Sequence, residues 1–127
     1  MVIVSIRPDN VTRLTEIARA RRGWISDLAW SPNGAALAVA HGATVTLFVA
    51  DTLAARGTLA GHGGPVKSIA VSRDGLLLAS GSADATARLW DLKRGGTFRE
   101  FSGHASAMEA VALSPDGALL AAANGQS

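Results

Sequence analysis

The fold of this chain is decided by residues 61–91, which read GHGGPVKSIAVSRDGLLLASGSADATARLWD. The stretch begins with Gly-His and ends with Trp-Asp, and a Ser-Arg-Asp-Gly turn separates two short apolar runs between them. Short apolar runs bounded by turn residues are typical of β-strands, and nearly continuous runs indicate strands covered on both faces. The stretch therefore predicts a small unit of packed β-strands.

The same unit recurs at a spacing of about 42 residues. Gly-His at 61–62 returns at 103–104, and Asp-Gly at 74–75 returns at 116–117. An Asn-Gly pair at 33–34 occupies the corresponding place earlier in the chain. A period of roughly 40–45 residues, marked by Gly-His and Trp-Asp, is typical of propeller blades.

On these motifs the chain resembles the WD-repeat family of β-propellers, from about Arg13 to its end. The resemblance implies an all-β fold of four-stranded antiparallel blades, in a propeller that is either partial or assembled from several chains. It divides the sequence into an N-terminal segment (1–23) with an outer fastening strand at 11–20, a degenerate blade (24–62), a blade with the complete motif (63–104) and an interrupted blade (105–127).

Composition narrows the class of protein. Hydrophobic residues make up 48% and charged residues 17%, which indicates a globular chain. Because cysteine is absent, a disulfide framework and thiolate chemistry are excluded. The N-terminus lacks the pattern of a secretion signal, and no apolar run approaches the roughly 18 residues of a membrane helix. We expect a cytoplasmic protein that does not bind a membrane.

The net charge is only +2, and the one basic cluster is Arg19, Arg21 and Arg22. A phosphate or nucleic-acid patch is one interpretation of this cluster, and a solvated turn is the other. A protein that binds nucleic acid would carry a wider basic stripe with interleaved aromatic residues, and tyrosine is absent from this sequence. The solvated turn is favoured, and no nucleic-acid partner is expected.

Four residues of the central copy, His62, Ser80, Asp84 and Trp90, have two interpretations. Ser, His and Asp could form a nucleophilic triad, but no nucleophile-elbow motif accompanies them. In WD-repeat proteins these positions form a hydrogen-bonded chain from Trp to Ser to His to Asp. A buried indole N–H needs an acceptor, and a hydroxyl can accept it while donating to an imidazole. We therefore expect a structural network and no enzyme.

Only the central copy has all four residues. The two histidines at 62 and 104 recur at the blade period, so they belong to different blades and predict no metal site. No phosphate loop and no paired carboxylates are visible, so no cofactor is expected. The hydrogen-bond network is incomplete in the other two copies. The first copy has Arg21 in the place of His62, Gly42 in that of Asp84 and Phe48 in that of Trp90. The third copy keeps a histidine, His104, but has Ala122 in the place of Ser80 and Gln126 in that of Asp84.

Propellers bind partners on loop-lined faces around a central channel. The family resemblance places the usual contact positions around the start of each innermost strand. Trp24 is the best single candidate because aromatic anchors dominate interface energetics, although it could instead pack against a neighbouring blade. We expect a scaffold for an unidentified protein partner, with contact positions at Trp24, Ser26, Pro65, Lys67, Ala107 and Glu109.

The predicted strands are one fastening strand at 11–20, four in each of two blades, and two in the last. Three blades cannot close a ring, which needs about four to eight. The chain is therefore either an N-terminal piece of a longer propeller or a structural unit that assembles through open blade edges into a homo-oligomeric ring. The ending within a blade favours the first alternative, because exchange of one strand would still leave each chain one strand short.

Overall fold

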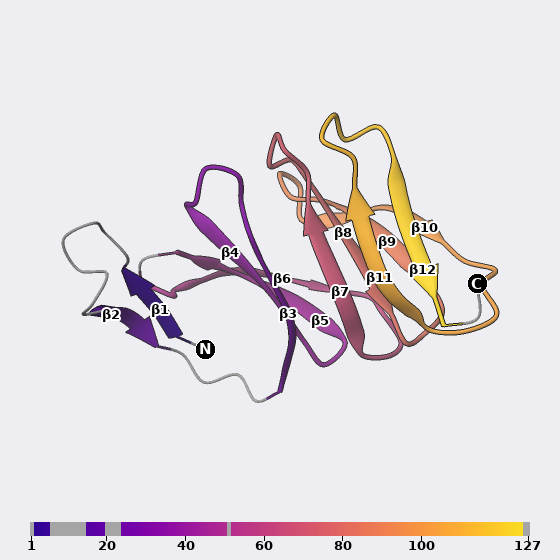
Figure 1. The fold of residues 1–127 in the computed structure, drawn as a ribbon, viewed down its shortest axis with the longest axis horizontal. Helices are drawn as coiled ribbons and strands as arrows, with labels where there is room; N and C mark the ends of the chain where they lie inside the picture. The colour runs from indigo at the N-terminus through magenta and orange to yellow at the C-terminus, as the bar shows by residue number, and fades with distance from the viewer. Residues whose placement is uncertain (1, 6–14, 20–23, 51, 126–127) are drawn as a thin grey trace.

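A computed structural model describes residues 2–5, 15–19, 24–50 and 52–125. These residues form twelve β-strands and no helix, and every strand pairing is antiparallel. The sheets lie in a row, with the N-terminus at one end and the C-terminus at the other (Figure 1). The all-β fold of antiparallel sheets expected from the sequence is confirmed.

Two of the four sheets are complete four-stranded blades in consecutive strand order. Blade 1 consists of β3 (Ile25–Trp30), β4 (Ala36–His41), β5 (Thr44–Val49) and β6 (Ala55–Ala60). Blade 2 consists of β7 (Val66–Val71), β8 (Leu77–Ser82), β9 (Ala87–Asp91) and β10 (Gly96–Phe101). The other two sheets are the half-blade β11 (Met108–Leu113) with β12 (Leu120–Asn124), and the N-terminal hairpin β1 (Val2–Ser5) with β2 (Thr15–Arg19).

From residue 24 onward ten strands form, four in each of two sheets and two in the last, as the sequence predicted. The N-terminal expectation needs correction. The fastening strand is present as β2, but it pairs with β1, a strand that the sequence did not predict. Positions 11–14 and 20 of the expected strand lie outside the described residues. The described chain therefore has twelve strands rather than eleven.

A serine and an Asx residue close the turn between the first and second strands of each sheet from residue 24 onward. The serine hydroxyl donates to the Asx side chain and accepts an N–H from the start of the next strand. Glycine follows with positive φ, a conformation that costs other residues more. The serine bond also lowers the pKa of Asp74 and Asp116. The hydroxyl–Asx distances are 2.7 Å for Ser31–Asn33, 2.6 Å for Ser72–Asp74 and 2.5 Å for Ser114–Asp116.

The main hydrophobic core lies between blades 1 and 2 and combines small residues of β4 with larger residues of blade 2. Small side chains allow the sheets to approach closely, and the large ring of Trp90 fills the remaining space. The buried members are Ala38, Ala40, Val45, Leu59, Val66, Ile69, Leu78 and Trp90.

Neighbouring blades are also joined by hydrogen bonds from a backbone N–H to a side-chain acceptor, and β3, β7 and β11 lie side by side (Figure 1). The Asp27 carboxylate accepts the N–H of Ile69 at 2.9 Å, and the Ser68 hydroxyl accepts the N–H of Val111 at 3.1 Å. The two acceptors occupy the same position in successive blades. Each therefore satisfies a backbone donor on the first strand of the following sheet.

Gly81 allows the half-blade to pack against blade 2. A Cβ at this position would lie 2.9 Å from Val111 Cγ1 and 3.1 Å from Met108 Cβ. We expect Gly81→Val to lower the free energy of unfolding by about 1–3 kcal/mol through overpacking. Gly57→Val is the matched control, because no atom lies within 4 Å of that Cβ. Urea denaturation of both variants measures the effect, and equal midpoints would contradict this packing.

Candidate partner-binding face

One chain of hydrogen bonds joins the four residues singled out in the central copy. The Trp90 indole N–H donates to Ser80 Oγ at 2.7 Å, and Ser80 Oγ lies 2.7 Å from His62 Nε2. His62 Nδ1 lies 3.0 Å from Asp84 Oδ2. With the Ser80 hydroxyl donating to Nε2 and the Nδ1–H donating to Asp84, each of these four side chains has a hydrogen-bond partner.

The carboxylate at the end of this chain receives further hydrogen bonds. Gly63 N–H donates to Oδ2 at 2.9 Å, and the Thr86 hydroxyl donates to Oδ1 at 2.6 Å. Burial by itself would raise the pKa of Asp84, but the bonds from Thr86, Gly63 and His62 outweigh it and hold the pKa well below its usual range. Sequence reasoning missed Thr86, which a motif of four residues does not include.

The geometry of Ser80 suits a structural role. Its side chain is completely buried, and its oxygen lies between the indole and the imidazole. The network joins β8 and β9 to the loop before β7. Two further bonds hold that loop: Ser82 Oγ donates to the Gly64 carbonyl, and Ala83 N–H donates to the Pro65 carbonyl. The buried network therefore fixes the segment that leads into Lys67.

The network is specific to blade 2 among the described blades. In blade 1, His41 Nε2 lies 2.7 Å from the hydroxyl of buried Thr46, a polar pair that the sequence analysis did not identify. In the half-blade, His104 is exposed. Blade 1 and the half-blade therefore rely on other contacts for their stability.

Five of the six predicted contact residues line one hollow of about 450 Å³. Trp24 at its edge is 87% exposed, so it does not pack against a blade in this structure. The sixth residue, Ala107, is partly buried and does not line the hollow. The walls of the hollow are formed by Trp24, Ser26, Gly42, Pro65, Val66, Lys67 and Glu109.

Ser26, Lys67 and Glu109 owe their positions to a repeated β-bulge. Each is the extra residue in the first strand of its sheet, where the register with the second strand shifts by one. A bulge redirects the side chain of the extra residue. Ser26 Oγ donates to the Val66 carbonyl at 2.5 Å, and Lys67 Nζ lies 3.2 Å from Glu109 Oε2.

Gly42 and Val66 also line the hollow, although sequence reasoning missed them. The Val66 N–H donates to the Gly42 carbonyl at 2.8 Å, which joins the loop of blade 1 to the start of β7. Gly42 has a φ of 55°, a left-handed conformation that suits glycine. A turn glycine gives no sign in the sequence that its carbonyl reaches the next blade.

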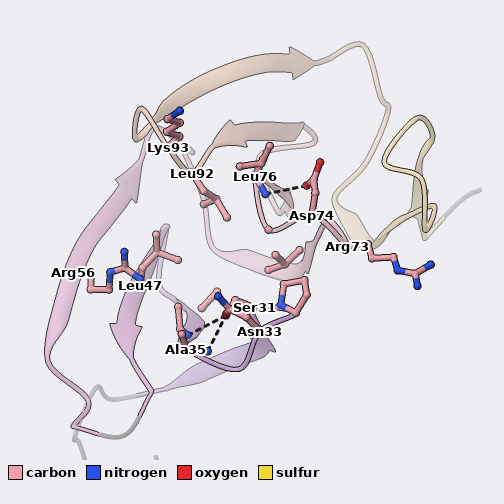
Figure 2. A pocket seen from close by; sticks show the side chains of 15 residues that line it. Ser31, Asn33, Ala35, Leu47, Arg56, Arg73, Asp74, Leu76, Leu92 and Lys93 are labelled. Atoms are coloured by element: carbon pink, nitrogen blue, oxygen red, sulfur yellow. Dashed lines mark hydrogen bonds between the residues drawn. The ribbon is translucent and has the colours of Figure 1, made fainter.

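A second hollow, of about 410 Å³, lies between blades 1 and 2 beside the turns of β3–β4 and β7–β8 (Figure 2). Leu47, Val71 and Leu92 line it and also pack against the main core. Figure 2 shows Arg73 extending away from the hollow, while Asn33 and Asp74 hold the turns by hydrogen bonds. None of the contact residues predicted from the sequence lies here.

Two further predictions concern metal ions and membranes. Among the described residues no group of three or more His, Cys, Asp or Glu side chains could hold a metal ion. The described part of the chain also contains no helix with the length and hydropathy to cross a membrane. Of the basic cluster, Arg19 lies in β2, and Arg21 and Arg22 are outside the described ranges.

Consecutive antiparallel blades, one of them held by the Trp–Ser–His–Asp chain, define a segment of a β-propeller. The family description "WD domain, G-beta repeat" matches residues 54–91 and 95–127, which together are more than half of the chain. The chain therefore belongs to the WD-repeat family.

Several curated proteins are similar to parts of the chain. It is 41% identical over 76 residues to "Small ribosomal subunit protein RACK1y" of Oryza sativa subsp. japonica, covering 58% of this chain and 23% of that protein. It is 36% identical over 85 residues to "Small ribosomal subunit protein RACK1z" of Arabidopsis thaliana, covering 65% and 26% respectively. "Periodic tryptophan protein 2 homolog" of Schizosaccharomyces pombe is 60% identical over 35 residues, covering 28% and 4%. The chain thus spans about a quarter or less of these relatives.

The central position of Ser80 gives a stability prediction. Ser80→Ala leaves the Trp90 N–H and a His62 nitrogen buried without their partner, which should cost about 1–3 kcal/mol of unfolding free energy. Ser102→Ala, at an exposed serine, should be close to neutral. Thermal and urea denaturation measure both variants, and similar curves for the two would contradict a stabilising network.

The lowered pKa of Asp84 predicts acid sensitivity. A group whose pKa is depressed by folding adds stability above its unfolded pKa of about 3.9, and this stability is lost as the pH falls toward the folded pKa. Wild type should therefore exceed Asp84→Asn in stability at neutral pH, and the difference should shrink below about pH 4. Urea titrations at several pH values measure this. A difference that stays constant with pH would contradict the assignment.

Proposed function

We propose that this chain is a non-catalytic WD-repeat propeller segment that acts as a protein-interaction scaffold. The observation that carries the proposal is Trp24, 87% exposed at the edge of a hollow whose other walls come from successive blades. The blade boundaries expected from the sequence, 24–62, 63–104 and 105–127, remain part of the proposal.

The chemistry of the hollow favours a protein segment as partner. Trp24 and Pro65 offer apolar surface that an anchoring side chain could cover, and buried aromatic anchors supply much of the binding energy at interfaces. Lys67 and Glu109 are 39% and 49% exposed at the same hollow. Exposed charges of this kind select partners and orient them more than they add affinity.

The non-catalytic part of the proposal is supported by how the polar groups are used. Ser80, His62 and Asp84, which have the residue types of a catalytic triad, hold one another and Trp90. A nucleophile would need an accessible hydroxyl beside an oxyanion site, and Ser80 is completely buried.

The cellular location and the kind of partner are also part of the proposal. Two relatives are named as small ribosomal subunit proteins, and this favours a cytoplasmic protein partner for the present chain. A partner that is protein, rather than nucleic acid or membrane, agrees with the small net charge of +2.

A second candidate is a closed homo-oligomeric ring with a structural role. One observation favours it: the described residues form two complete blades and two sheets of two strands each. Such a ring and a binding face around Trp24 are compatible with each other.

Replacement of Trp24 tests the scaffold proposal. Peptides selected from a displayed random library on the wild-type chain should bind Trp24→Ala at least about tenfold more weakly, because the anchor is lost. Trp30→Ala is the matched control, since Trp30 is 51% exposed at the opposite end of β3 and does not line the hollow. Fluorescence polarisation measures the affinities. Peptides that bind both variants as well as wild type would refute the proposed face.

A further inference from the structure

We propose that the hollow shown in Figure 2 is a second docking site, whose partner is an acidic peptide segment with one large apolar side chain. The apolar side chain enters the hollow, and carboxylates on either side of it pair with cations at the rim. We name this site the turn-side hollow, because the β3–β4 and β7–β8 turns form part of its wall. The proposal does not rest on the face around Trp24.

The turn-side hollow and the hollow beside Trp24 lie at opposite ends of β3. Trp24 directly precedes this strand, whereas Ser31 and Pro32, which line the turn-side hollow, directly follow it. A strand of six residues is about 20 Å long, so a short segment bound at one hollow leaves the other open. The two hollows are therefore separate sites that can be occupied at the same time.

Both walls of the turn-side hollow belong to complete blades, and their apolar part continues the main core. Leu47 of β5 comes from blade 1, and Val71 of β7 and Leu92 of the β9–β10 loop come from blade 2. All three are partly buried and pack against the core cluster. The hollow has a volume of about 410 Å³, and a cavity of about 150 Å³ can already hold benzene. One large apolar side chain of a partner therefore fits here.

Arg56 reaches the turn-side hollow through a β-bulge. The two residues that flank Arg56 in β6 pair with Leu47 and Phe48, which are neighbours in β5, so Arg56 is the extra residue of the later strand. A bulge redirects the side chain of the extra residue, and Arg56 lines the hollow together with Leu47 (Figure 2). Arg56 is exposed and has no ion pair or hydrogen bond with the side chain of another described residue. Its charge is therefore available to a partner.

The second cation is Lys93, which the β9–β10 loop holds at the rim. Asp91 Oδ1 accepts the backbone N–H of Lys93 at 2.9 Å and that of Arg94 at 3.0 Å. The Leu92 N–H donates to the Leu76 carbonyl at 3.0 Å, which ties the loop to the neighbouring turn. A loop that is already fixed loses less conformational entropy when a partner binds. Lys93 is exposed, and its ammonium group pairs with no carboxylate of the described residues.

The balance of charge at the turn-side hollow favours an acidic partner. Besides Arg56 and Lys93, the lining contains one acid, Asp74, and a further arginine, Arg73, whose side chain extends away from the hollow (Figure 2). Asp74 Oδ1 accepts two hydrogen bonds within its own turn. Positive charge therefore exceeds negative charge at the rim.

The hollow beside Trp24 differs in this respect. Its cation and its acid, Lys67 and Glu109, lie 3.2 Å apart and offset each other. Complementary charge selects partners and orients them, so a hollow with unpaired cations attracts a different segment from one whose charges are paired. The two hollows should therefore bind different partners.

The lining favours a peptide over a nucleic acid. A protein that binds single strands combines a long basic groove with aromatic side chains on which bases stack. Among the described residues that line the turn-side hollow none is aromatic. An apolar pocket with charges at its rim is instead the arrangement found at protein interfaces, where an anchoring side chain is buried and the rim stays polar.

Peptide selection on the full chain tests the charges. Peptides are selected from a displayed random library on the Trp24→Ala chain, so the other face lacks its anchor. We expect the selected peptides to be rich in Asp and Glu around one large apolar residue. Adding Arg56→Gln/Lys93→Gln should weaken their binding at least about fivefold, because two exposed charge pairs are lost. Isothermal titration calorimetry measures the affinities.

The matched control is Arg94→Gln/Arg99→Gln in the same background. It removes the same net charge at two exposed arginines that do not line the turn-side hollow, so binding should stay within about twofold of the Trp24→Ala chain. On the peptide side, alanine in place of the shared apolar residue should weaken binding about tenfold or more, because the anchor is removed.

Methyl NMR of the Trp24→Ala chain locates the bound peptide without further substitution. The methyl signals of Leu47 and Leu92 should shift when the peptide binds, because both side chains line the turn-side hollow. This measurement keeps the test decisive even where a glutamine variant fails to fold.

Acidic peptides with one apolar anchor, weakened by loss of Arg56 and Lys93 and shifting both leucine signals, support the site. Selection of no peptide, or of peptides without an acidic excess, overturns it. Equal affinities for the two double variants, or unchanged leucine signals, also overturn it. A single-stranded oligonucleotide that displaces the peptide at equal concentration overturns a peptide as the occupant. Because Trp24 is absent throughout, failure here is distinct from failure of the Trp24 face.

Discussion

The buried hydroxyl of Ser80, placed between an indole and an imidazole, is the contact on which blade 2 and the loop before β7 depend. A polar group taken from water must find partners inside the protein, and here each member of the chain from Trp90 to Asp84 supplies the next. Together with the bonds of Gly63, Ser82 and Ala83, this network fixes the loop before β7, which carries Pro65 and leads into Lys67. Stability of the blade and the shape of its surface thus have one origin.

Much of this arrangement follows from the sequence. Recurring Gly-His and Asx-Gly pairs locate the strand ends from residue 24 onward, because turn chemistry is local and each turn is held by its own serine. The network residues follow from the resemblance to the WD-repeat family, and the need of a buried indole and imidazole for hydrogen-bond partners supports that assignment. The family resemblance selects Ser26, Lys67 and Glu109 as contact positions, although only the register reveals the bulges that redirect them.

The rest could not be predicted, for physical reasons that differ by site. Strand β1 was not predicted because nine residues separate β1 from β2, whereas five separate β5 from β6. A fixed repeat period therefore does not align the N-terminal segment with the later blades. Gly42 and Thr86 were missed because their contacts join segments distant in sequence through a carbonyl and a hydroxyl. Exposure of Trp24 depends on which neighbour stands beside blade 1, and a sequence pattern does not contain that information.

The serine–Asx turns have a consequence for folding kinetics. Each closes a hairpin through bonds that span no more than five residues, so it forms with little loss of loop entropy. Hairpins held by such local contacts can form on a microsecond timescale, before distant strands meet. We therefore expect the slower step to be the docking of one blade on the next, in which Asp27 and Ser68 gain their donors.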